Sequence, residues 1–419
     1  MVWIWVILMG SFAAWGATRF CRDMANPVAI YTQVWTLTVA LFLAGWVSYL
    51  PVAPMLWWAV GLSTGGFLMG GWTALVWAMP KGQNSTAGMQ FEADEGRLRL
   101  LLKWFTLLGA VGLMLQIRHL QNTMGLDLLI EDPVAARRLH SNVPIWGYFN
   151  LLNVANMPLV VIYVRVAGRI RKWMVVTILL AVAAALITTD RTRFFYMVIW
   201  AFFVWIYLPG KPLSPGRKCM GLGLVVLLLL FFFTAIGEHF DRKYRDRFPE
   251  HIHFSERFQV LIEPYIYLTG SLAALDALLH DENPMYKGKF SFSPLVSLAQ
   301  FVFPDIETVR LQGKLYFVPM EINTYSYLQQ FYQDFGWWGI LFGPYLCGWL
   351  SAWVYALMRR KPTLLRVYMA ALWTFCCVMS VFVNTFTQEA TWFFVLVGIG
   401  AQAWVRLKKV NSGNPDPIP

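Results

Sequence analysis

The sequence contains few charged residues for its length. Only 14% of its 419 residues are Asp, Glu, Lys or Arg, whereas 58% are hydrophobic, and its mean hydropathy is +0.52. Soluble globular domains typically carry about 25% charged residues. This composition excludes an ordinary soluble domain and indicates a polytopic membrane protein.

Cysteine is also scarce, and its spacing excludes the common cysteine-based sites. The five cysteines lie in or beside apolar stretches, without a Cys-x-x-Cys pair or a histidine at ligand spacing. We therefore expect no disulfide framework and no metal site.

Acidic residues are fewer than basic ones, 23 against 34, which gives a formal net charge of +11. A nucleic-acid-binding protein concentrates its basic residues on one soluble face. Here they are distributed between apolar segments, so we expect no nucleic-acid partner.

Apolar segments of about 20 residues, the length that spans a bilayer, recur along the chain. They predict an all-α polytopic membrane protein with about eleven transmembrane helices. The first segment lacks a basic start and is followed by Arg19 and Arg22, so we interpret it as a retained helix, not a signal peptide. The predicted spans are Met1–Ala17, Pro27–Leu50, Pro54–Met79, Leu100–Ile117, Trp146–Val166, Trp173–Thr189, Phe194–Leu208, Cys219–Gly237, Gly339–Met358, Leu364–Asn384 and Trp392–Trp404.

The charges between these spans predict an N-out, C-in topology. Basic residues gather at every predicted inner turn, in agreement with the positive-inside rule. The acidic residues that fall on the inner side are only Asp23, Glu92, Asp94, Glu95 and Asp416. We expect residues 1–410 to form one transmembrane domain and residues 411–419 to be a disordered inner tail.

Two polar insertions lie on the predicted outer side, a long one over 238–338 and a shorter one over 118–145. The long insertion contains apolar residues near helical spacing between Phe254 and Leu268. It is therefore predicted to fold in part as helix and to cover a cavity between the membrane helices.

The short turn Asp190-Arg191-Thr192-Arg193 places two arginines at the outer interface, against the positive-inside pattern. Arginine suits bidentate binding of phosphate. These side chains could instead reach to headgroups or pair with Asp190.

Further basic residues lie in the two outer insertions. Their alternating charges also suit a solvated helix face. The candidates for an anion-binding rim are Arg137, Arg138, Arg242, Arg245 and Arg257. His253 lies among them as a candidate for proton transfer, whereas the His-x-His pair around Ile252 is a weak metal signal.

The stretch "INTYSYLQQFYQDFGWWG" over 322–339 keeps amides, hydroxyls and a carboxylate beside a predicted span. Such groups and aromatic rings can bind sugars, and Asn323, Tyr325 and Tyr327 are candidate substrate-binding residues. Tyr and Trp alone would also fit an interfacial aromatic belt. Gly336 and Gly339 bracket Trp337-Trp338, which predicts a sharp turn into the helix.

Three motifs in this part of the chain resemble Wzy-type oligosaccharide repeat-unit polymerases, the family of the O-antigen polymerases. They are a G-x-x-[ST]-F element at Gly288–Phe292, an N-x-Y-[ST] element at Asn323–Ser326, and a [YF]-x-D-x-G-x-x-G element at Tyr332–Gly339. The turn Arg191-Thr192-Arg193 resembles the arginine-containing turn of the same family.

The resemblance implies a GT-C-like glycosyltransferase of the bacterial inner membrane whose active site faces the periplasm. Its substrate would be an oligosaccharide linked to undecaprenyl diphosphate, and its partners would be membrane lipids and, as a further candidate, a chain-length regulator. No cofactor is implied, which agrees with the missing Gly-rich phosphate loop and the missing Asp-x-Asp. On this hypothesis Arg191 and Arg193 bind the diphosphate.

The acceptor hydroxyl of such a reaction needs a base, and the sequence offers three candidates, Glu321, Asp334 and His253. Two alternative functions remain at this point. One is an O-antigen ligase, which uses the same lipid donor with lipid A-core as acceptor. The other is a flippase or transporter, although we find no internal inverted repeat.

Overall fold

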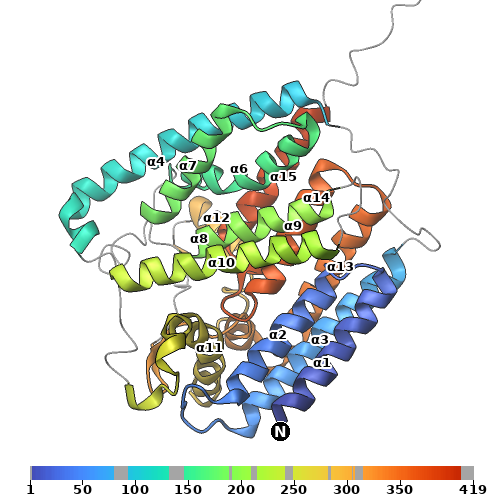
Figure 1. The fold of residues 1–419 in the computed structure, drawn as a ribbon, viewed down its shortest axis with the longest axis vertical. Helices are drawn as coiled ribbons and strands as arrows, with labels where there is room; N and C mark the ends of the chain where they lie inside the picture. Colours follow the sequence, from blue (N-terminus) through green and yellow to red (C-terminus); the bar gives the residue numbers. More distant parts are fainter. Residues whose placement is uncertain are drawn as a thin grey trace, which may run out of the picture. The chain divides into compact units, whose positions relative to one another are not determined.

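The computed structural model describes residues 2–79, 93–131, 146–187, 191–208, 215–240, 249–281, 285–303, 305–306 and 315–406. Almost all of these residues are helical, and the only strands among them are two short ones (Figure 1). The chain divides into two compact units. Unit 1 comprises Met1–Gly82, Cys219–Arg360 and Leu372–Trp392, and unit 2 comprises Gln83–Lys218, Lys361–Ala371 and Phe393–Pro419.

Helices make up most of each unit, and each predicted span lies largely within a helical segment. The helices that contain the first eight predicted spans are α1 (Val2–Cys21), α2 (Pro27–Ala44), α3 (Pro54–Ala78), α4 (Glu95–Glu131), α6 (Trp146–Ala167), α7 (Lys172–Ile187), the continuous segment α8 (Arg191–Phe195), a π-helical turn (Tyr196–Trp200) and α9 (Ala201–Tyr207), and α10 (Pro215–Phe240). The last three spans fall in α13 (Leu328–Arg360), α14 (Leu364–Met379) and α15 (Glu389–Arg406).

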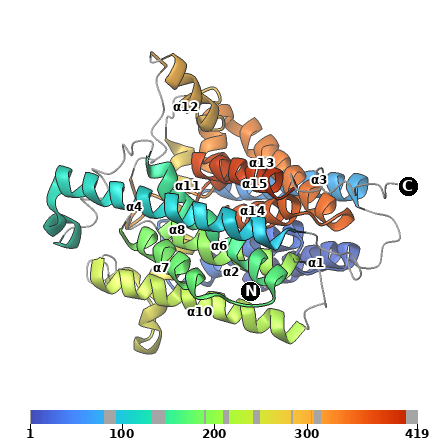
Figure 2. The ribbon, with the colours of Figure 1, turned by 90° about the horizontal axis from the view of Figure 1, so that it is seen from above.

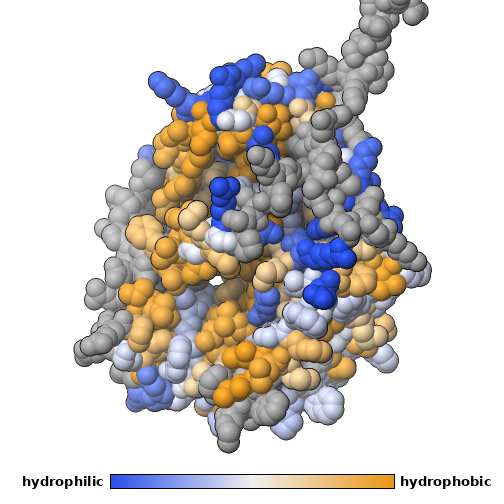
Figure 3. Space-filling model, turned by 45° about the vertical axis from the view of Figure 1, so that its right-hand side comes forward, coloured by the Kyte–Doolittle hydropathy of each residue, from blue (hydrophilic) through white to orange (hydrophobic). Residues whose placement is uncertain are grey.

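Five helices among the described residues are long and apolar enough to cross a membrane. They are α2, α3, α4 as far as Thr123, α6 and α13. Large apolar side chains are exposed along several of them, and Figure 3 shows broad apolar areas on the face that it presents. These features indicate a membrane protein.

Several predicted boundaries are displaced, for local reasons. Helix α2 ends at Ala44 instead of Leu50, because Gly45 adopts a left-handed conformation with φ 69°. Helix α4 continues far beyond Ile117 into the first predicted loop. Helix α14 ends at Met379, and Asn384 lies in the irregular segment that leads to α15.

Unit 1 is built around the contact of α3 with α13, which Figures 1 and 2 show side by side. Glycines let the two backbones come close, as in many membrane helix pairs. A Cβ atom on Gly70 would lie only 2.0 Å from the carbonyl oxygen of Tyr345. Between the two helices and α2, the rings of Tyr31 and Phe67 stack with centroids 3.6 Å apart.

The predicted outer insertion contributes a folded cap to unit 1. It contains two short 3₁₀ segments (Pro249–His251 and Glu256–Leu261), helix α11 (Ile262–His280), helix α12 (Ser293–Val302) and the hairpin of β1 (Tyr316–Phe317) and β2 (Glu321–Ile322). The prediction of a partly helical insertion is confirmed, although the longest helix begins only at Ile262.

Unit 2 is built on α4, α6, α7 and α9, with α6 in contact with the other three. Helix α6 carries Asn150, Asn153 and Asn156 at intervals of three residues, and all three are fully buried. Gln116 of α4 is also fully buried and accepts a hydrogen bond from Asn150. An apolar helix pair therefore encloses a row of amides.

Candidate functional site

The candidate site in unit 1 begins at a bend near the start of α13. Gly336 has φ 59° and ψ −140°, a conformation that only glycine adopts without strain. It separates a first segment, which starts at Leu328, from the long apolar part of the helix. The sharp turn predicted beside Trp337-Trp338 is confirmed.

Asp334 lies two residues before Gly336 and is 1% exposed. Its two carboxylate oxygens accept hydrogen bonds from the backbone N–H groups of Phe290, at 3.2 Å, and Ser291, at 2.6 Å. The N–H of Tyr286 donates to the carbonyl of Gln333 at 2.9 Å. Asp334 therefore fixes the 286–292 turn against α13, and both of its oxygens are engaged.

Two further polar groups near the start of α13 are paired with residues in or beside the irregular segment between α14 and α15. Gln330 accepts a hydrogen bond from the Thr387 hydroxyl at 2.5 Å, and the Tyr327 N–H donates to the carbonyl of Ser380 at 2.8 Å. The Tyr327 hydroxyl lies 2.8 Å from that of Tyr31. These buried groups are thus stabilised by hydrogen bonds within the protein.

The candidate sugar-binding residues differ in exposure. Asn323 is exposed, whereas the rings of Tyr325 and Tyr327 are buried. Burial raises the pKa of the Tyr325 hydroxyl, which has no hydrogen-bond partner within the described part of the chain. Of these three side chains, Asn323 is the one that can contact a ligand at the surface.

The candidate bases also differ in exposure, because Asp334 is buried whereas the other two are exposed. Glu321 is exposed on β2, and His253 is exposed in the segment before the second 3₁₀ turn. The Nε2 atom of the His253 ring lies 2.7 Å from the Ser48 hydroxyl. The backbone N–H of His253 donates to the backbone carbonyl of Trp46 at 2.9 Å. The connection between α2 and α3 thus holds His253 in place.

The arginines of the Asp190–Arg193 turn belong to a different compact unit from these residues. Arg191 and Arg193 lie in α8 of unit 2, and Arg193 is half-buried. The backbone of Arg257 is part of a 3₁₀ turn in unit 1. Arg137, Arg138, Arg242 and Arg245 lie outside the described residues.

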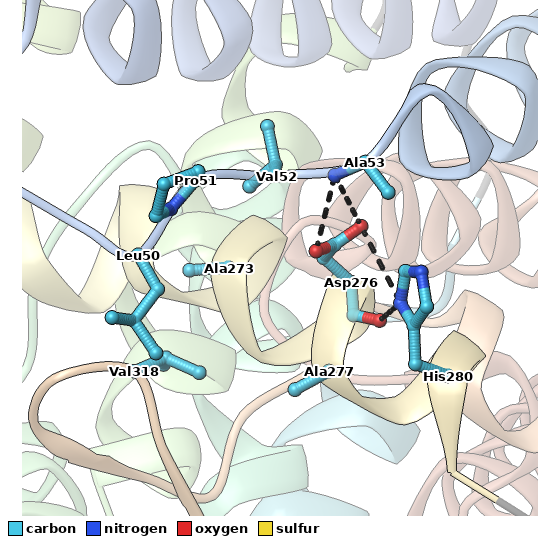
Figure 4. A pocket seen from close by; sticks show the side chains of 9 residues that line it. All are labelled: Leu50, Pro51, Val52, Ala53, Ala273, Asp276, Ala277, His280 and Val318. Carbon is cyan, nitrogen blue, oxygen red and sulfur yellow. Dashed lines mark hydrogen bonds and ion pairs between the residues drawn. The ribbon is translucent and has the colours of Figure 1, made fainter.

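A pocket that the sequence did not predict lies between α11 and the α2–α3 connection (Figure 4). It has a volume of about 310 Å³ and apolar walls that include Ala53, Ala273 and Val318. Asp276 lines it, and its oxygens accept hydrogen bonds from the Ala53 N–H at 3.2 and 3.3 Å. Burial raises the pKa of Asp276, although the Ala53 N–H and His280 act in the opposite direction.

His280 lies one helical turn after Asp276 and completes the polar part of this pocket. Its Nδ1 atom is 2.8 Å from the backbone carbonyl of Asp276 and 3.9 Å from the carboxylate. When Nδ1–H donates to this carbonyl, the Nε2 atom can accept a hydrogen bond from a hydroxyl group in the pocket. In the sequence, the Asp-x-x-x-His spacing on an apolar helix indicates this pair, because residues four apart lie on the same helix face.

Among the residues that the structure describes, no group of three or more His, Cys, Asp or Glu side chains could hold a metal ion. Comparisons with models of protein families, with curated proteins and with solved structures find no match to this chain.

Proposed function

We propose that the chain is an oligosaccharide repeat-unit polymerase of the bacterial inner membrane, with about eleven spans, a GT-C-like arrangement and its active site on the periplasmic side. One observation carries the proposal. The motif elements at Gly288–Phe292 and Tyr332–Gly339 are some 40 residues apart, yet the carboxylate of Asp334 in the second binds N–H groups of the first. Two of the motif elements on which the resemblance rests are thus joined in one structural element.

Contacts within unit 1 support the proposed topology. At the predicted inner side, Asp23 before α2 accepts hydrogen bonds from Tyr355 at 2.7 Å and Arg359 at 3.5 Å, near the end of α13. At the predicted outer side, Val47 forms a β-bridge with Ile252. Segments that the charge pattern assigns to one side are therefore in contact with each other.

Unit 2 gives the same support independently. Glu95, at the predicted inner end of α4, pairs with Arg171 of the next predicted inner turn at 3.0 Å. Arg97 donates to the carbonyl of Trp404, near the predicted inner end of α15, at 3.0 Å. Farther along α4, just past the predicted outer end of its span, the rings of His119 and Trp146 have centroids 6.2 Å apart.

In the proposed reaction, the hydroxyl of the incoming lipid-linked repeat attacks the anomeric carbon of the growing glycan. The bond from that carbon to the diphosphate oxygen breaks, and undecaprenyl diphosphate leaves as the hydroxyl proton passes to a base. The negative charge that develops on the leaving group requires cationic stabilisation. Arg191 and Arg193 are proposed for this role because guanidinium groups bind phosphate oxygens in pairs.

Glu321 and His253 remain the candidate bases of the proposal, since both are exposed on the cap of unit 1. Asp334 is better suited to a positioning role, because backbone N–H groups occupy its two oxygens. Asn323 is proposed to bind the acceptor sugar at the same surface.

The test compares Arg191→Ala and Arg191→Lys with Arg169→Ala, which removes an exposed arginine of the same unit on the predicted inner side. Each variant is expressed in a deletion strain and its glycan ladder is examined, together with its amount in the membrane. We expect the Arg191 variants to yield only single repeats at a normal protein level, and Arg169→Ala to restore long chains. Long chains in Arg191→Ala would contradict the assigned role.

The deletion strain itself separates the polymerase from its rivals. Loss of a polymerase leaves core capped with a single repeat, whereas loss of a ligase leaves free lipid-linked polymer. Purified chain that elongates a lipid-linked repeat in detergent would exclude a flippase or transporter. Free polymer in the deletion strain would overturn the proposed function.

A further inference from the structure

Helix α12 has the reverse of the usual arrangement of polar and apolar side chains. Its serines face the protein, because Ser293 donates a hydrogen bond to the carbonyl of Thr387 at 3.1 Å and Ser297 donates to the carboxylate of Glu389. Large apolar residues face outward. These are Phe292, Leu295, Leu298, Val302 and Phe303, each between 55% and 71% exposed.

The outward residues form one continuous face. Phe292, Leu295, Leu298 and Val302 follow one another at intervals of three or four residues, which places them on the same side of a helix. Within unit 1, helix α12 projects beyond α13 (Figure 2). A row of this kind would be unfavourable in water, so its surroundings must be apolar.

The apolar row on α12 is continuous with the outward face of α13. A Cβ atom on Gly288 would lie 3.0 Å from the ring of Phe292 and 3.3 Å from that of Phe335, so both rings lie over this glycine. Phe335 in turn lines a pocket of about 340 Å³ together with Trp337 and Trp338. Beyond them, the exposed row of α13 continues along the part that is long and apolar enough to cross a membrane.

The length of α12 decides how it meets the bilayer. Ten residues extend about 15 Å, about half the thickness of the hydrocarbon core. The helix therefore cannot span the bilayer, but it can lie in the interface with its apolar face among the acyl chains. Trp337 and Trp338, at the start of the long apolar part of α13, are typical interfacial anchors.

We propose that α12 is an interfacial helix whose apolar face lies in the lipid of the outer leaflet beside the start of α13. The inference concerns a surface and its partner, the acyl chains of the bilayer, and it does not depend on the polymerase reaction. On this proposal, part of the large outer insertion is bound to the membrane surface and is not exposed to water.

The test measures the surroundings of single spin labels in full-length protein reconstituted into bilayers. Cys219 is the exposed native cysteine among the five, so Cys219→Ser provides the background. Labels replace Leu295, Leu298 or Val302 on α12. Leu346, exposed on α13, serves as the lipid-facing reference, and Lys287 serves as the aqueous reference.

Accessibility to oxygen and to a water-soluble nickel chelate reports the environment of each label. We expect the oxygen-to-nickel ratio at the three α12 positions to be several times that at Lys287 and close to that at Leu346. A ratio close to that at Lys287 would place the helix in water and overturn the proposal. Protection from both reagents would also overturn it, because a protein partner or a second copy of the chain would then cover the face.

Discussion

Units 1 and 2 both bury polar side chains among apolar helices, but these side chains find their hydrogen-bond partners in different places. In unit 1, the polar residues at the start of α13 bind backbone groups and hydroxyls of non-helical segments, as Asp334 binds the N–H groups of Phe290 and Ser291. In unit 2, the amides of α6 bind each other and the neighbouring helix α4.

The difference in partners reflects a difference in location. Irregular segments can present backbone N–H groups that have no partner within the segment. A carboxylate can accept hydrogen bonds from such groups. Within a pair of membrane helices the backbone is already satisfied, so neutral amides and hydroxyls serve as interhelical contacts. Asn153 and Asn156 each keep an amide oxygen without a partner in the described structure, whereas both oxygens of Asp334 are paired.

The largest effect on the free energy of unfolding is expected from removing the Asp334 carboxylate in unit 1. Asp334→Ala leaves two N–H groups without an acceptor, and each unpaired group costs about 1 to 3 kcal/mol when buried. We expect the free energy of unfolding to fall by about 3 kcal/mol, measured as thermal unfolding of the purified protein in detergent. Asp334→Asn should fall between Ala and wild type because it keeps one acceptor oxygen.

The control for this comparison is Asp305→Ala, which removes an exposed carboxylate of the same unit. It should unfold like the wild type. If Asp334→Ala did so too, the hydrogen bonds between the two motif elements would contribute nothing to stability.

The bend before the apolar part of α13 is expected to have the next largest effect. Gly336→Ala forces an L residue into a conformation that only glycine tolerates, at a cost of about 1 to 3 kcal/mol. Gly61 of α3 has open space around it and is the matched control. We expect a lower midpoint of thermal unfolding for Gly336→Ala and none of that loss for Gly61→Ala, and equal midpoints would show that the bend is not strained by a Cβ.

Substitutions in the amide row of unit 2, Asn150, Asn153 and Asn156, should lower the stability less. Asn153 donates to the carbonyl of Gly109 at 2.9 Å and to the amide oxygen of Asn150 at 3.0 Å, so Asn153→Ala should cost about 1 kcal/mol. Asn156 makes one long contact with Thr106, at 3.5 Å. Asn156→Ala should therefore change the unfolding midpoint less, and an equal loss in the two variants would contradict the ranking.

The two regions also differ in how far the sequence could predict them. The apolar runs predicted the helices, and Gly336 beside two tryptophans predicted the bend in α13. The partners of Asp334 lie some 40 residues away in a non-periodic segment, and no local pattern encodes that pairing. The three-residue spacing of Asn150, Asn153 and Asn156 was readable in the sequence, but an apolar run hides isolated polar residues when only its mean hydropathy is considered.

The two units should also differ in how their buried polar residues make stability depend on pH. Unit 1 also buries Asp276, whose pKa is raised because burial disfavours its charged form. A raised pKa in the folded protein means that the folded state binds the proton more tightly than the unfolded state does. Relative to Asp276→Asn, the wild type is therefore most stable at low pH and loses stability as the pH rises through the folded pKa.

The measurement is the difference in unfolding midpoint between the wild type and Asp276→Asn, followed from pH 7 towards the ordinary aspartate pKa of about 3.9. We expect the difference to shift in favour of the wild type as the pH falls. The corresponding difference for Asn153→Ala should stay constant over the same range, because no titratable group is removed. A constant difference for Asp276→Asn would mean that its carboxylate is as well solvated in the folded protein as in the unfolded chain.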